Sequence, residues 1–293
     1  MPELPDIDVY VEVLTNKLLD HPLTGLRLGS PFVLRSVTPP VADCVGARIA
    51  ELRRVGKRVA FGLDNGLWIV VHLMVAGRLH WHPEPPGLKA KNRIASLDFD
   101  HGSLLLTEAG TKKRASLAIA AGEDGLAEHD PGGLEPLAID RQTFAAILRR
   151  ENHTLKRALT DPKALSGIGN AYSDEILHAA RLSPVRLSQQ LDDEEMRRLY
   201  DSIRSVLSEW RDRLREEAGG EMPERVTAFR PGMRVHGRYG KPCPVCENPV
   251  QRIRYKDNET NYCAACQTES RILKDRSLSR LLKKDWPKTL DEL

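Results

Sequence analysis

Four cysteines in two close pairs constrain the fold of this chain more than any other feature. They form two Cys-x-x-Cys motifs separated by sixteen residues, at Cys243, Cys246, Cys263 and Cys266. Each motif places two sulfur atoms on one side of a tight turn, and two such turns at the base of a hairpin complete a tetrahedral four-sulfur site. Two disulfides or a redox pair are the alternative. The paired spacing, without a secretion signal, favours one structural Zn²⁺ ion.

The segment around these cysteines is basic. Residues 225–293 contain 15 Lys and Arg against 8 Asp and Glu, whereas the first 224 residues contain 29 against 33. Between the cysteine pairs, Arg252–Lys256 and Asn261–Tyr262 predict the strands of a hairpin whose cations would contact phosphates. The charge asymmetry predicts a polyanion partner, although an ordinary solvated surface would carry similar charge. The fifth cysteine, Cys44, is expected to be a small buried residue.

The chain begins Met1-Pro2-Glu3-Leu4-Pro5-Asp6. Removal of Met1 would leave Pro2 with a free secondary amine. Because α-amino groups titrate near pH ~8, a usable fraction is neutral at physiological pH and can attack an electrophilic carbon to form an iminium. Glu3 is adjacent and could transfer the proton. The alternative is that the prolines only stiffen a surface terminus.

Hydrophobic periodicity predicts a strand-rich first half and a helical second half. Residues 6–20 fit a strand or a helix, and the helical spacing of their apolar residues favours a helix capped by Asp6. Residues 23–119 contain short strands, with an Asn65-Gly66 hairpin signal, and predict a β-sandwich or barrel. Residues 122–138 are rich in Gly, Pro and acids and predict a linker. The longest helix is expected over residues 191–218.

A glycine-rich turn, Ser166–Tyr172, lies among the predicted helices and opens another one. Its backbone amides and the positive end of the helix could hold a phosphate. Asn170 would add a side-chain donor and Lys156 a positive charge. A plain tight turn between helices is the alternative, since short glycine patterns are common.

Five segments, in this order, resemble the formamidopyrimidine-DNA glycosylase / endonuclease VIII family. They are Pro2–Pro5, Arg53–Lys57, His72–Leu79, Leu155-Lys156 with Gly167–Tyr172, and the zinc hairpin after His236–Gly240. The match covers roughly residues 2–268. The resemblance implies an α+β multidomain fold with an N-terminal β-sandwich flanked by helices, a helix–two-turn–helix domain and a C-terminal zinc finger hairpin. The corresponding boundaries are a catalytic domain at 2–128, a linker at 129–139, the DNA-binding domain at 140–231 and the zinc finger at 232–268. A basic C-terminal extension, residues 269–293, continues beyond the point where members of the family usually end.

The resemblance also implies an activity, that of a bifunctional DNA glycosylase and abasic-site lyase of base excision repair. Pro2 would be the Schiff-base nucleophile, Glu3 the general acid and proton shuttle, and Lys57 an assistant in the elimination steps. Lys156 and Asn170 would bind phosphates beside the damaged nucleotide. The implied substrates are oxidised bases, namely formamidopyrimidines, oxidised pyrimidines and 8-oxoguanine, in damaged double-stranded DNA.

Several positions depart from the family pattern. Val75 stands where one branch places a wedge methionine, and the neighbouring Met74 could substitute for it. The Arg-Phe pair of that branch is not evident in Thr107–Arg114. Asn258 stands at the hairpin tip where a phosphate-binding arginine is common, so Lys256 or Arg254 would have to compensate or δ-elimination would be weak. Asp6 replaces a glutamate. The stretch 219–238 is short for a branch that caps oxidised purines, so formamidopyrimidines and oxidised pyrimidines are expected at least as readily as 8-oxoguanine.

Two alternative functions stay open. One is a DNA-binding protein that has lost base excision, and the other is a lyase acting mainly on abasic sites. Pro2, Glu3 and Lys57 together favour an enzyme. His72 fits either a packed core histidine or a group near the scissile phosphate. No apolar run approaches the ~20 residues of a membrane span, so we expect a cytoplasmic, nucleoid-associated protein without a membrane partner. We also expect a monomer.

Overall fold

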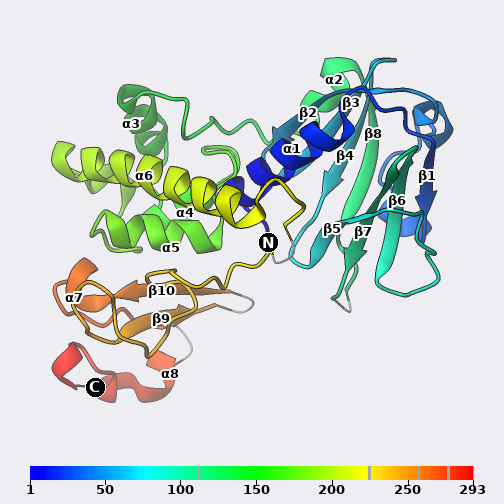
Figure 1. Cartoon of the computed structure of the whole chain (residues 1–293). Helices are drawn as coiled ribbons and strands as arrows, with labels where there is room; N and C mark the ends of the chain where they lie inside the picture. Colours follow the sequence, from blue (N-terminus) through cyan, green and yellow to red (C-terminus); the bar gives the residue numbers. More distant parts are fainter. Residues whose placement is uncertain (111, 224–225, 256–257, 276–277, 293) are drawn as a thin grey trace. The chain divides into compact units, whose positions relative to one another are not determined.

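The computed structural model describes residues 1–110, 112–223, 226–255, 258–275 and 278–292. The chain forms two compact units (Figure 1). Unit 1 contains Met1–Pro131 and Trp210–Thr227, and unit 2 contains Gly132–Glu209 and Ala228–Leu293. The boundary therefore passes through the long helix α6, Asp193–Ala218. No helix among the described residues has the length and apolar content needed to cross a membrane.

Unit 1 is built on two four-stranded antiparallel sheets that share one hydrophobic core. The first sheet has the order β2 (Ile49–Val55), β3 (Arg58–Leu63), β4 (Leu67–His72) and β8 (Ser116–Ala121). The second has the order β1 (Gly25–Leu28), β6 (Arg93–Phe99), β7 (Gly102–Glu108) and β5 (Gly77–His82). The predicted N-terminal β-sandwich is therefore confirmed. Asn65 and Gly66, with φ of 82° at the glycine, form the β3–β4 turn that the sequence predicted.

The helix α1, Leu4–Leu18, packs on the first sheet against β2 and β3. The predicted helix over residues 6–20 is confirmed, although it begins two residues earlier. The cause is a capping box in which the backbone N–H of Glu3 donates to the Asp6 carboxylate at 2.9 Å and the Glu3 carboxylate accepts from the Asp6 backbone. Ile7, Tyr10 and Leu14 recur at helical spacing and are fully buried in the core. This packing fixes the start of the chain to a rigid element.

The stretch predicted as a linker begins with a helix. Gly122–Ala127 form α2, with Glu123 and Asp124 in its first turn, where acids are favourable. Leu126 is buried and anchors the helix in a small cluster with Trp68 and other residues of the first sheet. The first unit continues to Pro131, so the segment between the two units starts later than the acidic composition suggests.

Unit 2 contains a group of helices and a two-stranded hairpin. The helices are α3 (Arg141–Arg150), α4 (Leu155–Thr160), α5 (Asn170–Ala179), the first part of α6, α7 (Ala264–Gln267) and α8 (Leu278–Leu282). The hairpin pairs β9 (Val250–Arg254) with β10 (Glu259–Cys263) in antiparallel register. The predicted long helix over 191–218 and the predicted zinc hairpin strands are thus confirmed within a residue or two at each boundary, apart from Lys256, which lies outside the described residues.

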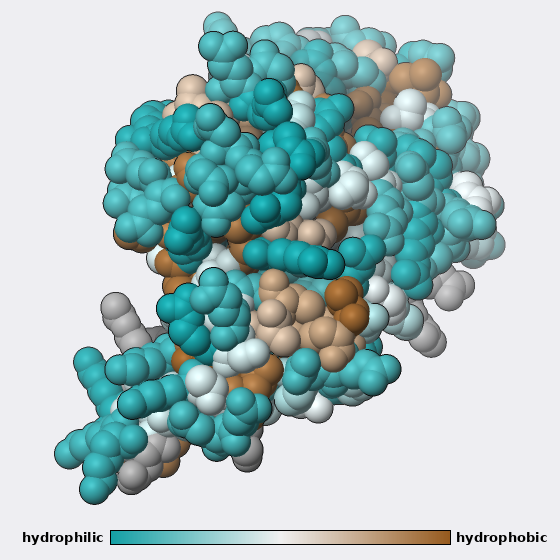
Figure 2. Space-filling model, turned by 90° about the vertical axis from the view of Figure 1, so that its left-hand side faces the viewer, coloured by the Kyte–Doolittle hydropathy of each residue, from teal (hydrophilic) through white to brown (hydrophobic). Residues whose placement is uncertain are grey.

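The C-terminal extension packs on the hairpin. The backbone N–H of Leu273 donates to the Tyr262 hydroxyl at 2.7 Å, and the backbone N–H of Arg254 donates to the Asp275 carboxylate at 2.5 Å. Ile272, Leu273 and Leu290 of the extension cover the buried side chains of Ile253, Tyr262 and Ala264. The extension is therefore part of unit 2. Figure 2 shows one face of the molecule, which is largely hydrophilic with small hydrophobic areas.

Candidate catalytic and nucleic-acid-binding sites

The first three residues form the first candidate site, in unit 1. Pro2 is buried and the Glu3 side chain is only 3% exposed. The capping box holds Glu3 at the start of α1 through Asp6, directly beside the nitrogen of Pro2 in the chain. The structure thus places a carboxyl group and the chain terminus together on the first turn of a packed helix, where positional freedom is small.

Charged side chains surround the amino terminus. Burial lowers the pKa of the Met1 α-amino group below its ordinary 8.0, and Arg78 and Lys57 lower it too, whereas Glu3 and Asp6 raise it. Lys57 lies in the turn between β2 and β3, and Arg78 lies on β5. A lowered pKa increases the fraction of neutral amine at pH 7, which is the nucleophilic form.

The structure therefore brings Lys57 into electrostatic range of the N-terminus, together with Arg78. The sequence did not single out Arg78, although it belongs to the segment His72–Leu79 that carries part of the family resemblance. Its proximity depends on β5 and α1, which are far apart in the chain, so no local pattern marks it.

His72 is the last residue of β4 and pairs in register with Arg58 on β3. Burial lowers the pKa of His72 to about 4, and the charges of Arg58 and Lys57 lower it in the same direction. The imidazole is therefore neutral at pH 7 and offers a hydrogen bond without a charge. It is half-buried, between the apolar core and the surface.

The β4–β5 loop presents Val75. The Val75 side chain is 62% exposed, whereas Met74 is half-buried and has a φ of 52°, in the left-handed region. The expectation that Met74 takes over from Val75 as a wedge is therefore not favoured by the exposure of the two side chains. In the nearby chain segment after β7, the Glu108 carboxylate is buried and accepts the backbone N–H groups of Arg114 and Ala115 at 2.9–3.2 Å.

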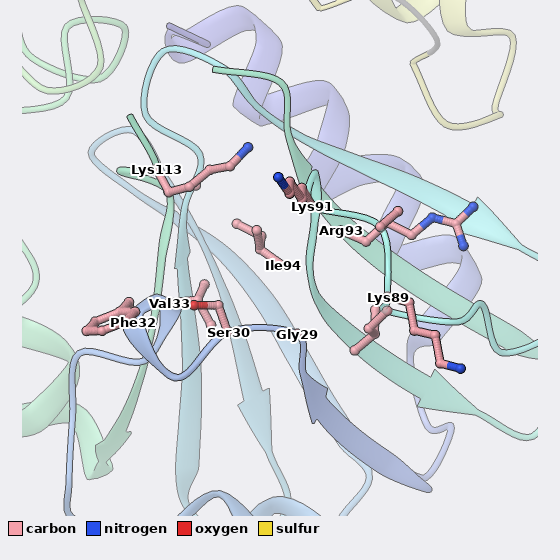
Figure 3. A pocket seen from close by; sticks show the side chains of 12 residues that line it. Gly29, Ser30, Phe32, Val33, Lys89, Lys91, Arg93, Ile94 and Lys113 are labelled. Carbon is pink, nitrogen blue, oxygen red and sulfur yellow. The ribbon is translucent and has the colours of Figure 1, made fainter. Parts of the chain in front are cut away.

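Unit 1 also has a cation-lined pocket of about 290 Å³ that sequence reasoning missed (Figure 3). Its walls include Phe32, Val33 and Ile94, and the Phe32 side chain is 79% exposed. In Figure 3 the side chains of Lys91 and Lys113 point toward one another at one end of the pocket. The Lys113 ammonium also donates to the backbone carbonyl of Glu108, so the pocket combines an apolar wall with positive charge.

The two predicted phosphate-binding residues of unit 2 come together. The Lys156 ammonium, on α4, donates to the Asn170 carbonyl at 2.7 Å and to the Asp174 carboxylate at 2.5 Å. Asn170 is the first residue of α5, and its side-chain amide donates to the Glu259 carbonyl at 2.9 Å. The glycine-rich turn opens a helix as predicted, with φ of 78° at Gly167. These bonds use two of the three ammonium hydrogens of Lys156. Phosphate binding by Lys156 and Asn170 stays a prediction.

Two buried acids on α5 connect the helices to the hairpin, and the sequence did not single them out. Asp174 also accepts from the His236 ring at 2.7 Å and from the Asn261 backbone N–H at 3.1 Å. Glu175 accepts three consecutive backbone N–H groups, at residues 234–236, at 2.7–2.9 Å. Burial raises the pKa of Glu175, and these three bonds oppose that effect. The only local signal is a pair of acids within a helix that is otherwise mostly apolar and buried.

The four predicted zinc ligands converge at the base of the hairpin. Their sulfur atoms lie within 4.8 Å of one another, and the shorter separations are 3.4, 3.5 and 3.9 Å. A tetrahedron with Zn–S bonds of about 2.3 Å has sulfur–sulfur edges of about 3.8 Å, so the geometry fits the ion. Burial raises the pKa of the Cys263 thiol to about 12, and a bound cation would favour its thiolate. Four sulfur ligands leave no open position, so this Zn²⁺ is structural.

The hairpin tip is only partly described. Lys256 lies outside the described residues. Asn258 is exposed, and its carbonyl accepts the Tyr255 backbone N–H at 2.7 Å. The guanidinium of Arg252 lies over the Tyr239 ring, 4.1 Å from its centroid. Contacts of Lys256 and Asn258 with DNA therefore stay predictions. Cys44 is fully buried, as expected.

Comparison with known proteins gives a consistent family assignment. Residues 1–113 match the formamidopyrimidine-DNA glycosylase N-terminal domain, residues 133–212 match the formamidopyrimidine-DNA glycosylase H2TH domain, and residues 240–268 match the zinc finger found in FPG and IleRS. The chain is 34% identical to a formamidopyrimidine-DNA glycosylase of Heliobacterium modesticaldum over 279 residues, covering 91% of this chain and all of that protein.

Solved structures agree with the fold. The MutM (FPG) protein of Thermus thermophilus is similar with a TM-score of 0.75 and 30% identity, over 91% of this chain and 98% of that one. The Lactococcus lactis FPG (MutM) in complex with DNA containing an oxidised pyrimidine has a TM-score of 0.81 at 22% identity, over 91% and 100% of the two chains. At that identity the second likeness concerns the fold alone.

Proposed function

The chain belongs to the formamidopyrimidine-DNA glycosylase family of DNA-repair enzymes, and on this premise we propose that it is a bifunctional glycosylase and abasic-site lyase. Its substrate is an oxidised base in damaged double-stranded DNA. The observation that carries the proposal is the buried first turn of α1, where Pro2 lies beside the fixed carboxyl of Glu3 and the charge of Lys57 acts on the chain terminus. A nucleophile, an acid and a cation in one place meet the needs of the reaction.

The nitrogen of Pro2, freed by removal of Met1, attacks C1′ of the damaged nucleotide. The bond from C1′ to the base breaks, and the base leaves with a proton supplied by Glu3. The amine proton of Pro2 passes to O4′ as the C1′–O4′ bond breaks, and this opening of the sugar ring forms the iminium. The iminium acidifies the protons on C2′. A base takes one of them, the C3′–O bond breaks, and the 3′ phosphate leaves in the β-elimination step that cuts the strand. Lys57, whose charge lies near the amine, stabilises the anionic groups of this sequence.

The damaged nucleotide has to leave the duplex before the reaction, at a cost of a few kcal/mol. Contacts with the flanking phosphates offset this cost. Lys156 has one ammonium hydrogen beyond its bonds to Asn170 and Asp174, and that hydrogen is the one we assign to a phosphate. His72 is neutral at pH 7, so it would contact DNA as a hydrogen-bond partner.

The positions that differ from the family pattern bear on two properties, namely the ratio of β- to δ-elimination product and the preferred lesion. Asn258 lacks a positive charge at the hairpin tip, so β-elimination product should exceed δ-elimination product. Val75, the exposed residue of its loop, is small and fills less of the space left by a flipped base than a methionine would. The stretch 219–238 is short for a branch that caps oxidised purines, so we assign formamidopyrimidines and oxidised pyrimidines as substrates at least as good as 8-oxoguanine.

Trapping with borohydride tests the nucleophile. Borohydride reduces the iminium and leaves a covalent protein–DNA adduct at an abasic site. We expect the adduct with the processed chain and its loss when an uncleaved N-terminal tag blocks Pro2. The control is the same tag removed so that Pro2 is restored as the first residue. Adduct formation by the blocked protein would assign the nucleophile to a lysine and contradict the proposal.

The second candidate function is that of a lyase without base excision. The choice of DNA substrate distinguishes it from a glycosylase. A panel of duplexes with single lesions should give free base and a cut strand if the chain is a glycosylase. A protein that cuts only pre-formed abasic sites would leave every lesion intact. We expect the protein to act as a monomer on DNA in the nucleoid, which sedimentation of the complex would check.

A further inference from the structure

A second cluster of metal-ligand side chains lies in unit 1. His21 follows α1, and Asp100 and His101 form the turn between β6 and β7. One ligand atom from each of the three lies within 4.8 Å of the others. Both rings approach the same carboxylate oxygen: Nδ1 of His21 lies 3.1 Å from Oδ1 of Asp100, and Nδ1 of His101 lies 2.8 Å from it.

A second contact orients the ring of His101. Its Nε2 lies 2.9 Å from the backbone carbonyl of Lys17, and a carbonyl only accepts, so Nε2 carries the hydrogen. In a neutral ring the other nitrogen, Nδ1, then has a lone pair. In that tautomer Nδ1 and the Asp100 carboxylate oxygen, 2.8 Å apart, can both ligate one ion, and the Lys17 carbonyl is the outer partner of the ring.

The geometry suits a single ion. A divalent ion can accept lone pairs from Nδ1 of both rings and from the shared carboxylate oxygen at once. The two ring centroids are only 4.0 Å apart, so both rings lie close enough to share one ion. The carbonyl of Lys17 is in the last turn of α1, and the negative end of the helix favours a cation nearby.

We propose that His21, Asp100 and His101 bind one divalent transition-metal ion of the Zn²⁺, Ni²⁺ or Cu²⁺ class. Imidazole nitrogens suit these ions, and three protein ligands on a half-exposed surface leave positions for water. The ion connects the C-terminal end of α1 to the β6–β7 turn. It therefore stabilises the helix whose other end carries Pro2 and Glu3.

Trp81 provides the readout. Its ring centroid lies 5.1 Å from that of His101, so a paramagnetic ion at the cluster quenches its fluorescence. The zinc-loaded full-length protein is titrated with Ni²⁺, and bound nickel is measured after equilibrium dialysis. We expect one Ni²⁺ per chain in addition to the zinc of the finger, with saturable quenching. Trp81→Phe should remove the fluorescence change and keep the nickel.

Ligand variants decide the assignment. Loss of an outer-shell partner commonly weakens a metal site about 10–100-fold, so His21→Ala and His101→Ala should each weaken Ni²⁺ binding at least about 100-fold. His82→Ala, a half-buried histidine of β5 next to Trp81 in the chain, should leave it unchanged. Excess Ni²⁺ should raise the Tm of the wild type and of His82→Ala, but not that of His101→Ala.

Two results would overturn the proposal. One is equal nickel affinity in the wild type, His21→Ala and His101→Ala, which would place the ion elsewhere. The other is the absence of any nickel bound to the wild type in addition to the zinc of the finger. Zinc content of the finger is measured throughout, so that exchange at the four cysteines is separated from binding at this cluster.

Discussion

At the scale of single residues, Glu3 combines two tasks in one carboxyl group. It caps α1 through the backbone of Asp6, and in the proposed mechanism it protonates the departing base. The cap requires an oxygen that accepts, whereas the chemistry requires a group that releases a proton. The two tasks can therefore be separated by a substitution that keeps the oxygen and removes the acid.

Glu3→Gln is the variant that separates them. The amide oxygen still accepts the Asp6 backbone N–H, so we expect the Tm to change little, whereas Glu3→Ala should cost about 1 kcal/mol through the lost cap. Excision of a damaged base should fall by about 10²–10⁴-fold in Glu3→Gln, because general acid catalysis is lost. Single-turnover release of the base measures this. Near-normal excision by Glu3→Gln would remove Glu3 from the acid's role.

His72 gives a prediction for stability against pH. Its pKa is lowered to about 4 in the folded chain from 6.5, so unfolding takes up a proton below pH 6.5. The contribution of His72 to the free energy of unfolding is therefore fully present above pH 6.5 and is lost as the pH falls toward 4. The loss between pH 7 and pH 5 is about 2 kcal/mol.

The His72→Gln variant tests that contribution. Between pH 7 and pH 5 the free energy of unfolding should fall for both proteins. The fall should be about 2 kcal/mol smaller for the variant than for the wild type. Denaturant unfolding at the two pH values measures the difference. The buried His178 has its pKa lowered to about 4 by burial as well, and it is retained in both proteins, so it cancels in the comparison. Identical pH dependence in both would show that His72 is accessible to protons.

At the scale of elements, local patterns predicted much of the fold. The apolar spacing of α1 and α6, the Asn65-Gly66 turn and the cysteine motifs depend on neighbours in the chain, and all were recovered. Contacts between residues far apart in the chain left no local signal. Asp174, for example, accepts hydrogen bonds from residues 18, 62 and 87 positions away. The helix α2 was missed for another reason, because its composition is typical of a linker and only one buried leucine anchors it.

The extension should act as a brace for the zinc hairpin. A chain ending at Glu269 loses the contacts of Leu273 and Asp275 with β9 and β10, as well as the cover over Ile253. We expect faster hydrogen exchange of the β9–β10 amides and weaker DNA binding, with one zinc still bound. Tyr262→Phe, which removes only the acceptor for Leu273, should show a smaller effect in the same direction. Unchanged exchange in the truncated chain would mean that the hairpin is self-sufficient.

At the scale of the whole molecule, the proposed chemistry and the zinc belong to different units. Pro2 and Glu3 are in unit 1, whereas the four cysteines, Lys156 and Asn170 are in unit 2. A contribution from unit 2 to substrate binding therefore differs from a contribution to the reaction itself. The two appear separately in kinetics, as the DNA concentration at half-saturation and as the rate at saturation.

Removal of zinc should affect binding alone. Because a structural zinc site supplies the folding energy of its hairpin, chelation should disorder the hairpin. We expect the abasic DNA concentration for half-maximal trapping to rise more than about tenfold, with the saturating rate nearly unchanged. Titration of trapping with and without a chelator measures both quantities, and zinc re-addition is the control. A collapse of the saturating rate alone would show that unit 2 takes part in the chemical step.

The burial of the first residues has a consequence for how the protein matures. Pro2 is enclosed and Met1 is half-buried once α1 is packed on the sheet. An aminopeptidase needs the end of the chain extended and accessible, so the folded molecule is a poor substrate for it. On the proposed mechanism we therefore expect Met1 to be cleaved before α1 packs, and a molecule that folds first would lack the proposed amine of Pro2.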